Sequence, residues 1–193
     1  MKNKKLLFIL ALFLAQALRA GETQAETPSR DGARPRAGRA FIEIGINLAV
    51  STFNYWSKYT KFLEDWQFTL TWKDQKRKFF TSEGLRLDSN NMSLNWTHAW
   101  AGGLYYNWAR TNRFSPFGSF LFSFGGSLFW EYIAEWREVA SINDMIFTSA
   151  GGPAIGEPLF QIASHFRSRP GFLNRIACIL VNPVLGINDA IDG

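Results

Sequence analysis

Residues 141–157 read Ser-Ile-Asn-Asp-Met-Ile-Phe-Thr-Ser-Ala-Gly-Gly-Pro-Ala-Ile-Gly-Glu and combine a helix start with a run of small residues. Ser141 can cap the free amides of a helix, and Asp144 stands three residues later, as in a capping box. A GxxxG pattern follows at 152–156, which is typical of helices that pack backbone against backbone. Glycine inside a helix costs about 1 kcal/mol relative to alanine unless close packing offsets it. The stretch therefore predicts a closely packed helix over 141–166.

Three further apolar segments have helical spacing. The first carries a polar residue at every fourth position, and the third starts with Ser115 as N-cap and Pro116 at the first helical position. The sequence therefore predicts a mainly α fold, a compact bundle of about four hydrophobic helices with polar stripes that face inward. The predicted helices cover 41–55, 92–110, 115–137 and 141–166, with kinks in the last at Pro153 and Pro158.

Residues 66–88 have a period of two instead. Trp66, Phe68 and Leu70 alternate with polar residues, and the basic segment Lys73 to Lys78 follows. Alternation with aromatic and threonine enrichment is typical of strands. We therefore expect a small β-hairpin near 66–88.

The first forty residues differ in composition from the rest. Three lysines precede the apolar run Leu6 to Leu14, and small residues follow, so residues 1–25 are typical of a secretory signal peptide. Residues 26–40 are polar and predict a disordered linker. Residues 41–193 then form a single helical, membrane-associated domain. We expect the chain to be exported, and its single cysteine, Cys178, excludes a disulfide within the chain.

The charge distribution argues against nucleic acid as a partner. The chain has 21 basic and 16 acidic residues, a net charge of +5, but from Phe41 onward 13 basic residues balance 13 acidic ones. The excess positive charge thus belongs to the leader and linker. Aromatic residues make up 16% of the chain beside only 19% charged residues, which favours a membrane environment.

Polar side chains recur along three of the predicted helices. We expect these stripes to face one another, because an unpaired charge in hydrocarbon costs several kcal/mol. Candidate catalytic residues on the stripes are His98, Glu131, Glu135 and Asp144. Candidate structural residues are Asn95, Arg110, Ser141, Asn143, Gly151, Gly152, Gly156 and Glu157.

Two interpretations of these polar residues stay open. In the functional one, the clustered carboxylates and His98 form a general acid/base or metal site. In the structural one, Glu131 and Glu135 pair with Arg110 and Arg137, and Asp144 only caps its helix. Because the sequence has no HExxH, no CxxC and no histidine pair at ligand spacing, it indicates no particular metal, and we expect no cofactor.

Four motifs stand out in the chain: Asn-Trp-Thr-His at 95–98, WEYxxE at 130–135, SINDxIxTxxGGxxxGE at 141–157 and Asn-Pro at 182–183. Together they resemble the motifs of a bacterial envelope family, the domain of unknown function three-nine-four-three. The resemblance implies a signal-bearing protein of the Gram-negative envelope, associated with the outer membrane. A smaller likeness to VanZ-like helical membrane proteins rests on His98, Glu131, Asp144 and the spaced glycines, and it implies a helical fold with a polar core.

These observations lead to two expectations about function. The first is a non-enzymatic envelope protein with a structural or lipid-interacting role, at the outer membrane or the periplasmic face of the envelope. Its expected partners are membrane lipid and a second envelope protein, with no nucleic acid. The alternative is a membrane-embedded enzyme or carrier that acts on lipid through a cluster of His98, Glu131 and Asp144.

Overall fold

A computed structural model describes residues 34–58, 66–87 and 92–192, and these residues are mainly helical, as predicted. The described residues from Pro35 onward belong to one compact unit. The predicted signal peptide at 1–25 lies outside the described residues. The elements are α2 (Ala37–Lys58), α3 (Trp72–Phe80), η1 (Ser82–Gly84), β1 (Leu85–Arg86), α4 (Met92–Thr111), α5 (Pro116–Phe129), η2 (Trp130–Ala134), β2 (Ala140–Ser141), α6 (Ile142–Gly151), η3 (Gly152–Gly156), α7 (Glu157–Arg167), α8 (Phe172–Val181) and α9 (Pro183–Asp192).

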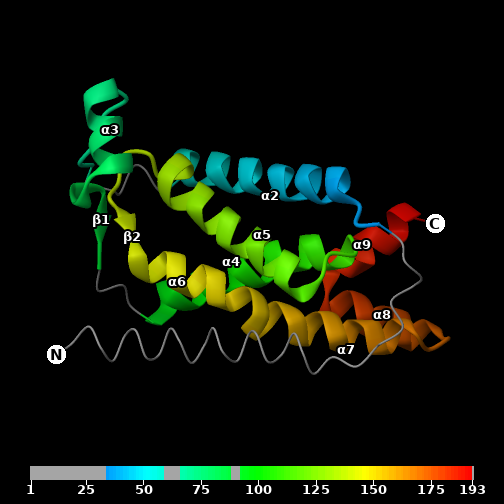
Figure 1. Ribbon diagram of the computed structural model, residues 1–193. Helices are drawn as coiled ribbons and strands as arrows, with labels where there is room; N and C mark the ends of the chain where they lie inside the picture. The colour runs from blue at the N-terminus through cyan, green and yellow to red at the C-terminus, as the bar shows by residue number, and fades with distance from the viewer. Residues whose placement is uncertain (1–33, 59–65, 88–91, 193) are drawn as a thin grey trace. The chain divides into compact units, whose positions relative to one another are not determined.

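Helix α4 is the centre of this unit (Figure 1). It packs against α2, α5, α6, η3, α7 and α9, while α8 lies between α7 and α9. On one side of α4, buried Ile44 and Leu48 of α2 pack with Tyr105 of α4 and Phe122 of α5. A second core joins the last three helices through Ala163, Cys178 and Leu185. The described residues thus form more helices than the four expected, because residues 72–80 form α3 and the chain after residue 171 adds α8 and α9.

Helices α4 and α6 cross with their backbones in contact. A Cβ on Gly102 would lie 1.7 Å from the carbonyl oxygen of Thr148, and a Cβ on Gly151 would lie 1.9 Å from that of Ala99. Backbones approach this closely only where side chains are missing. The small residues at this crossing therefore place the second half of α6 directly beside α4.

Two short π-helical turns interrupt the long helices. In η2 the N–H of Glu135 donates to the carbonyl of Trp130 at 2.9 Å, five residues back. In η3 the N–H of Glu157 likewise donates to the carbonyl of Gly152. Proline removes one helical donor, and a π turn re-forms the pattern around it. The helix predicted over 141–166 is therefore divided into α6, η3 and α7. Pro153 lies in η3, and Pro158 lies in the first turn of α7.

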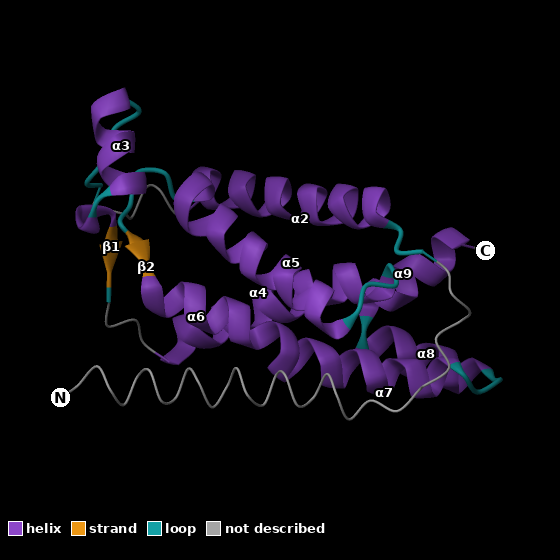
Figure 2. Ribbon diagram, in the orientation of Figure 1, coloured by secondary structure: helices purple, strands orange, loops and turns teal. Residues whose placement is uncertain are grey.

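The predicted β-hairpin near 66–88 is wrong. Thr71 instead caps α3 by accepting a hydrogen bond from the N–H of Asp74, and the basic segment forms that helix. Before this helix, the N–H groups of Gln67 and Phe68 both donate to the carbonyl of Arg137. The described residues hold a two-stranded sheet of another kind, in which β1 pairs parallel with β2 (Figure 2).

The predicted linker also ends earlier than expected. Helix α2 begins at Ala37, and Ala40 is fully buried. Arg36 and Arg39 each pair with Asp192 at 2.5 Å, which ties the start of α2 to the end of α9. These ion pairs order a segment whose composition alone favours disorder. Within the described ranges, every helix is too short or too polar to serve as a membrane span.

Candidate functional site

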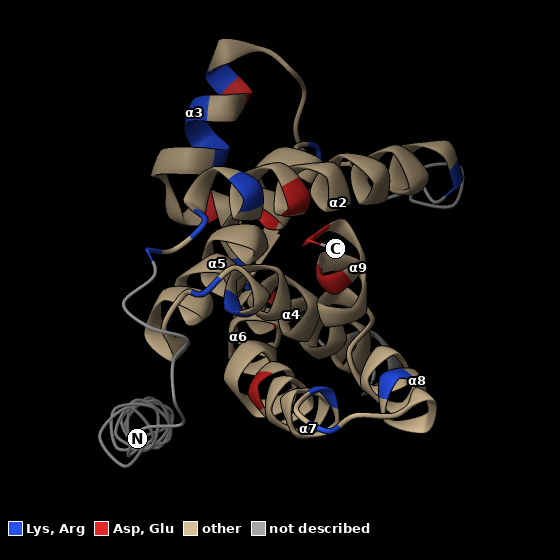
Figure 3. Ribbon diagram, turned by 90° about the vertical axis from the view of Figure 1, so that its right-hand side faces the viewer, with Lys and Arg blue, Asp and Glu red and all other residues tan. Residues whose placement is uncertain are grey.

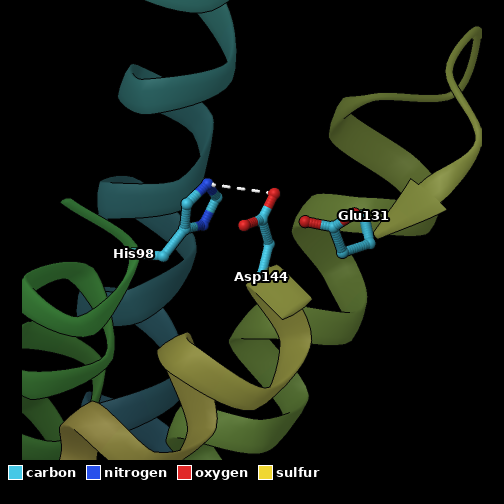
Figure 4. A group of neighbouring side chains, drawn as sticks. All are labelled: His98, Glu131 and Asp144. Atoms are coloured by element: carbon cyan, nitrogen blue, oxygen red, sulfur yellow. Dashed lines mark ion pairs between the residues drawn. The ribbon is translucent and has the colours of Figure 1, made fainter. Parts of the chain in front are cut away.

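Three of the four candidate catalytic residues meet at one point (Figure 4). His98 comes from α4, Glu131 from η2 and Asp144 from the first turn of α6. One imidazole nitrogen of His98 and one carboxylate oxygen each of Glu131 and Asp144 all lie within 4.8 Å of one another. His98 Nε2 lies 3.4 Å from Asp144 Oδ2. The close α4–α6 crossing brings His98 and Asp144 together, and the turn after α5 adds Glu131.

The backbone around β2 and α6 positions the two carboxylates. The N–H of Ser141 donates to Glu131 Oε2 at 2.7 Å, and the Ser141 hydroxyl accepts from the N–H of Asp144 at 3.2 Å. Ser141 is therefore the cap, as the sequence predicts, and it leaves the Asp144 carboxylate directed at His98. On the other side, the Thr148 hydroxyl lies 3.4 Å from His98 Nδ1.

Glu131 lies in an unusual environment for a carboxylate. Its side chain is only 1% exposed. Burial, with a further contribution from the charge of Asp144, raises the pKa of Glu131 to about 8, although the hydrogen bond from Ser141 opposes the shift. Perturbed carboxyl groups of this kind gather at functional sites more often than elsewhere.

Glu135 does not join the three. Its Oε1 accepts a hydrogen bond from Trp130 Nε1 at 2.8 Å. The i, i+4 spacing of Glu131 and Glu135 places them on one face only in an α-helix, and η2 is a π turn with more residues per turn. Burial and the charges of Glu131 and Glu138 raise the pKa of Glu135 well above its usual range.

A buried lysine lies beside the cluster. Lys78 of α3 is 1% exposed, and its Nζ donates to the carbonyl oxygens of Glu131 at 2.7 Å and Glu135 at 2.6 Å. Burial lowers the pKa of Lys78 to about 8. The sequence offers no signal that separates Lys78 from its exposed neighbours Lys73 and Lys76, so sequence reasoning missed it.

Glu157 and Arg110 form a separate cluster. Arg110 Nε donates to Glu157 Oε2 at 2.8 Å and its Nη2 donates to Oε1 at 3.1 Å, and the Tyr106 hydroxyl also donates to Oε2 at 2.6 Å. Arg137 lies with its guanidinium 3.6 Å from the ring centre of Trp66. The structural interpretation, in which Glu131 and Glu135 pair with Arg110 and Arg137, does not match these contacts, because Arg110 binds Glu157 and Arg137 lies against Trp66.

The remaining candidate structural residues lie around the α4–α6 crossing. Asn95 precedes His98 by one turn, and Asn143 precedes Asp144. Added Cβ atoms on Gly152 and Gly156 would lie 2.3 Å from Ser123 Oγ and 2.9 Å from the Tyr106 side chain. Gly152 and Gly156 therefore allow η3 to pack closely against α4 and α5.

Comparison with known proteins gives one result. No curated protein and no solved structure matches the chain. The model of a family described as Domain of unknown function (DUF3943) matches residues 84–184, and this range holds β1, α4, the His98, Glu131 and Asp144 cluster and α6. Since the match covers more than half of the 193 residues, the chain belongs to the DUF3943 family.

Proposed function

We propose that this chain is a membrane-apposed protein of the Gram-negative cell envelope that binds lipid through exposed apolar faces of its helices. The observation that carries the proposal is the outer face of α2. There Ile42, Ile46, Val50 and Phe53 recur at helical spacing, and Phe53 is 75% exposed. Soluble monomers rarely leave a continuous apolar stripe in water, so this face favours a non-aqueous partner.

The opposite face of the same helix is apolar as well. Ala40, Ile44 and Leu48 are buried against α4 and α5. A helix that is apolar on both faces gains little from facing water on either side. Lipid on the outer face would complete the burial of α2.

Helix α3 has the composition of an interfacial anchor. Trp72 and Phe80 are exposed, and Phe80 is 80% exposed. Exposed Lys73 and Lys76 lie on the same short helix, where basic residues gather (Figure 3). Lys76 Nζ lies 5.1 Å from the centre of the Trp72 ring. Aromatic and basic side chains together favour the boundary between acyl chains and anionic head groups.

The turn between α7 and α8 has a similar combination. Phe172 and Leu173 are exposed at the start of α8, next to exposed Arg169 and Arg175. A membrane satisfies both kinds of group, because acyl chains cover the apolar side chains and anionic head groups attract the basic ones. Lipid is therefore the partner that we propose, and a second envelope protein is the alternative.

Vesicle flotation tests the proposal. Purified protein should float with vesicles of phosphatidylglycerol and phosphatidylethanolamine, and the double variant Ile46→Gln, Val50→Gln should bind at least about tenfold more weakly, since each change removes an apolar side chain from lipid. Ser57→Gln, an exposed polar change on the same helix, is the matched control. Equal flotation of the double variant and the control would contradict the proposal, as would no flotation of the wild type.

The envelope location is tested separately by fractionation. After cell fractionation, the chain should be found with the outer membrane. The proposal includes export by residues 1–25 and contact with the periplasmic leaflet of that membrane. A purely periplasmic chain would reject lipid contact in the cell, and a cytoplasmic one would reject the envelope role altogether.

A second candidate function is favoured by the convergence of His98, Glu131 and Asp144 within 4.8 Å. In this case the cluster acts on a lipid-derived group as an enzyme or carrier site. His98→Ala and Glu131→Gln should then abolish an envelope phenotype while the protein level stays normal. Loss of the protein itself in both variants would instead favour a structural role for the cluster.

A further inference from the structure

The groups that meet in Figure 4 are donors that divalent metal ions use. An imidazole nitrogen and two carboxylate oxygens come from three separate elements and converge within 4.8 Å. Zn²⁺ binds such nitrogen and oxygen ligands, and three protein ligands leave a fourth position open. We infer that His98, Glu131 and Asp144 bind one divalent transition-metal ion, of the Zn²⁺ or Mn²⁺ class, with at least one open coordination position.

The His98–Asp144 separation supports a shared ion. The 3.4 Å between His98 Nε2 and Asp144 Oδ2 exceeds the roughly 2.7–3.2 Å of a good N–H···O hydrogen bond. Two ligands about 2.0–2.1 Å from one tetrahedral ion lie about 3.3–3.4 Å apart. The pair therefore has the spacing of two ligands of one ion, and only Glu131 needs to approach further.

Acidic side chains gather at the site. Glu131 and Asp144 are both buried, and Glu135 follows directly after the π turn that carries Glu131. Lys78 opposes them, but its Nζ is directed at two backbone carbonyls and not at a carboxylate. A divalent ion between the two carboxylates would neutralise Glu131 and Asp144 together.

The ligands are oriented by neighbours of their own. Thr148 Oγ1 lies 3.4 Å from His98 Nδ1, which leaves Nε2 facing Asp144. The N–H of Ser141 holds one oxygen of Glu131, and in Figure 4 the other carboxylate oxygen points toward Asp144. Metal sites depend on such surrounding hydrogen bonds to orient their ligands before the ion arrives.

The competing arrangement is a metal-free cluster. There a protonated His98 pairs with Asp144, and Glu131 stays protonated beside them. This arrangement needs no ion and predicts no change of stability when divalent metal is added or removed. Metal binding therefore separates the two arrangements directly.

The test uses purified full-length protein, stripped with EDTA and titrated with Zn²⁺ by calorimetry and with Co²⁺ by visible absorption. We expect about one ion per chain, Co²⁺ absorption bands typical of four or five ligands, and a higher melting temperature with Zn²⁺. His98→Gln, Glu131→Gln and Asp144→Asn should each lower affinity at least about 100-fold. The chain has only two histidines, so His165→Gln is the matched control and should bind as the wild type does.

Two results would overturn the inference. One is a wild type that binds neither ion and melts at the same temperature with metal and with EDTA. The other is equal affinity in the His98 and His165 variants, which would place the ion elsewhere. If His98→Gln does not fold, the metal affinity of Asp144→Asn and the melting curves of the wild type still show whether the cluster binds an ion. Vesicle binding is measured separately, so its failure would leave the metal inference standing.

Discussion

Glu157 shows how a buried carboxylate in this protein is stabilised when its partners are cationic. Arg110 and Tyr106 hold both of its oxygens, and Gln161 adds a third donor at 2.6 Å. Burial alone would raise the pKa of Glu157, but the hydrogen bonds from Arg110 and Tyr106 outweigh it, so the pKa is below 4.5. Glu131, which lacks such a partner, shifts the other way.

The opposite shifts lead to a pH-dependent prediction for Glu157. Because the folded state favours the ionised form, its stabilising contribution is complete above about pH 4.5 and is lost as the pH falls through the lower folded pKa. Glu157→Gln should therefore lower the free energy of unfolding by about 1–3 kcal/mol at pH 7, and by less at pH 3. Urea unfolding followed by circular dichroism at both pH values measures this. The prediction is contradicted if the variant and the wild type differ in free energy of unfolding by the same amount at both pH values. The control is Glu83→Gln, which removes an exposed carboxylate paired with Arg77.

At the scale of single residues, the sequence predicts position better than contact. From helical spacing alone, His98, Glu131 and Asp144 are predicted to face the interior of the helix bundle. The same spacing fails for Glu135, because the hydrogen bond from its N–H to Trp130 belongs to a π turn that no spacing rule anticipates. Lys78 is also unpredictable, since its burial depends on carbonyls that come from a distant part of the chain.

At the scale of elements, the crossing of α4 and α6 depends on missing side chains. Gly151→Ala would place a Cβ 1.9 Å from the Ala99 carbonyl, and neither backbone can move without disturbing the other helix. We expect this change to destabilise the protein by about 3 kcal/mol. Thermal and urea unfolding of the variant measure the effect.

Gly125 on α5 is the matched control for that prediction. A Cβ at Gly125 would meet nothing within 4 Å. Gly125→Ala should therefore stabilise the protein by about 0.5–1 kcal/mol through the higher helix propensity of alanine. If both variants lose the same stability, the close crossing is not what constrains Gly151.

The elements themselves were predictable where local chemistry determines them. Ser115 and Ser141 cap helices, as their sequence context indicates. The predicted hairpin is wrong because Thr71 caps a helix, and because Gln67 and Phe68 bind the carbonyl of Arg137, a contact that the local sequence does not contain. The parallel pairing of Leu85 with Ala140 has the same non-local origin.

At the scale of the whole molecule, apolar surface is spread over several helices. Large exposed side chains occur on α2, α3, α5 and α8, among others. Without lipid, such surfaces bury one another. We expect the purified protein to self-associate in detergent-free buffer and to become monomeric in mild detergent, as measured by sedimentation velocity. A single monomeric species in plain buffer would show that this surface tolerates water.

The ion pairs of Arg36 and Arg39 with Asp192 have a consequence for chain connectivity. They bring the first turn of α2 and the last turn of α9 into contact. Domains whose two ends lie close together tolerate circular permutation and insertion into other proteins. A few glycines could therefore join Asp192 to Pro35, or the whole body could be inserted as a cassette into a surface loop of a carrier protein with both junctions side by side.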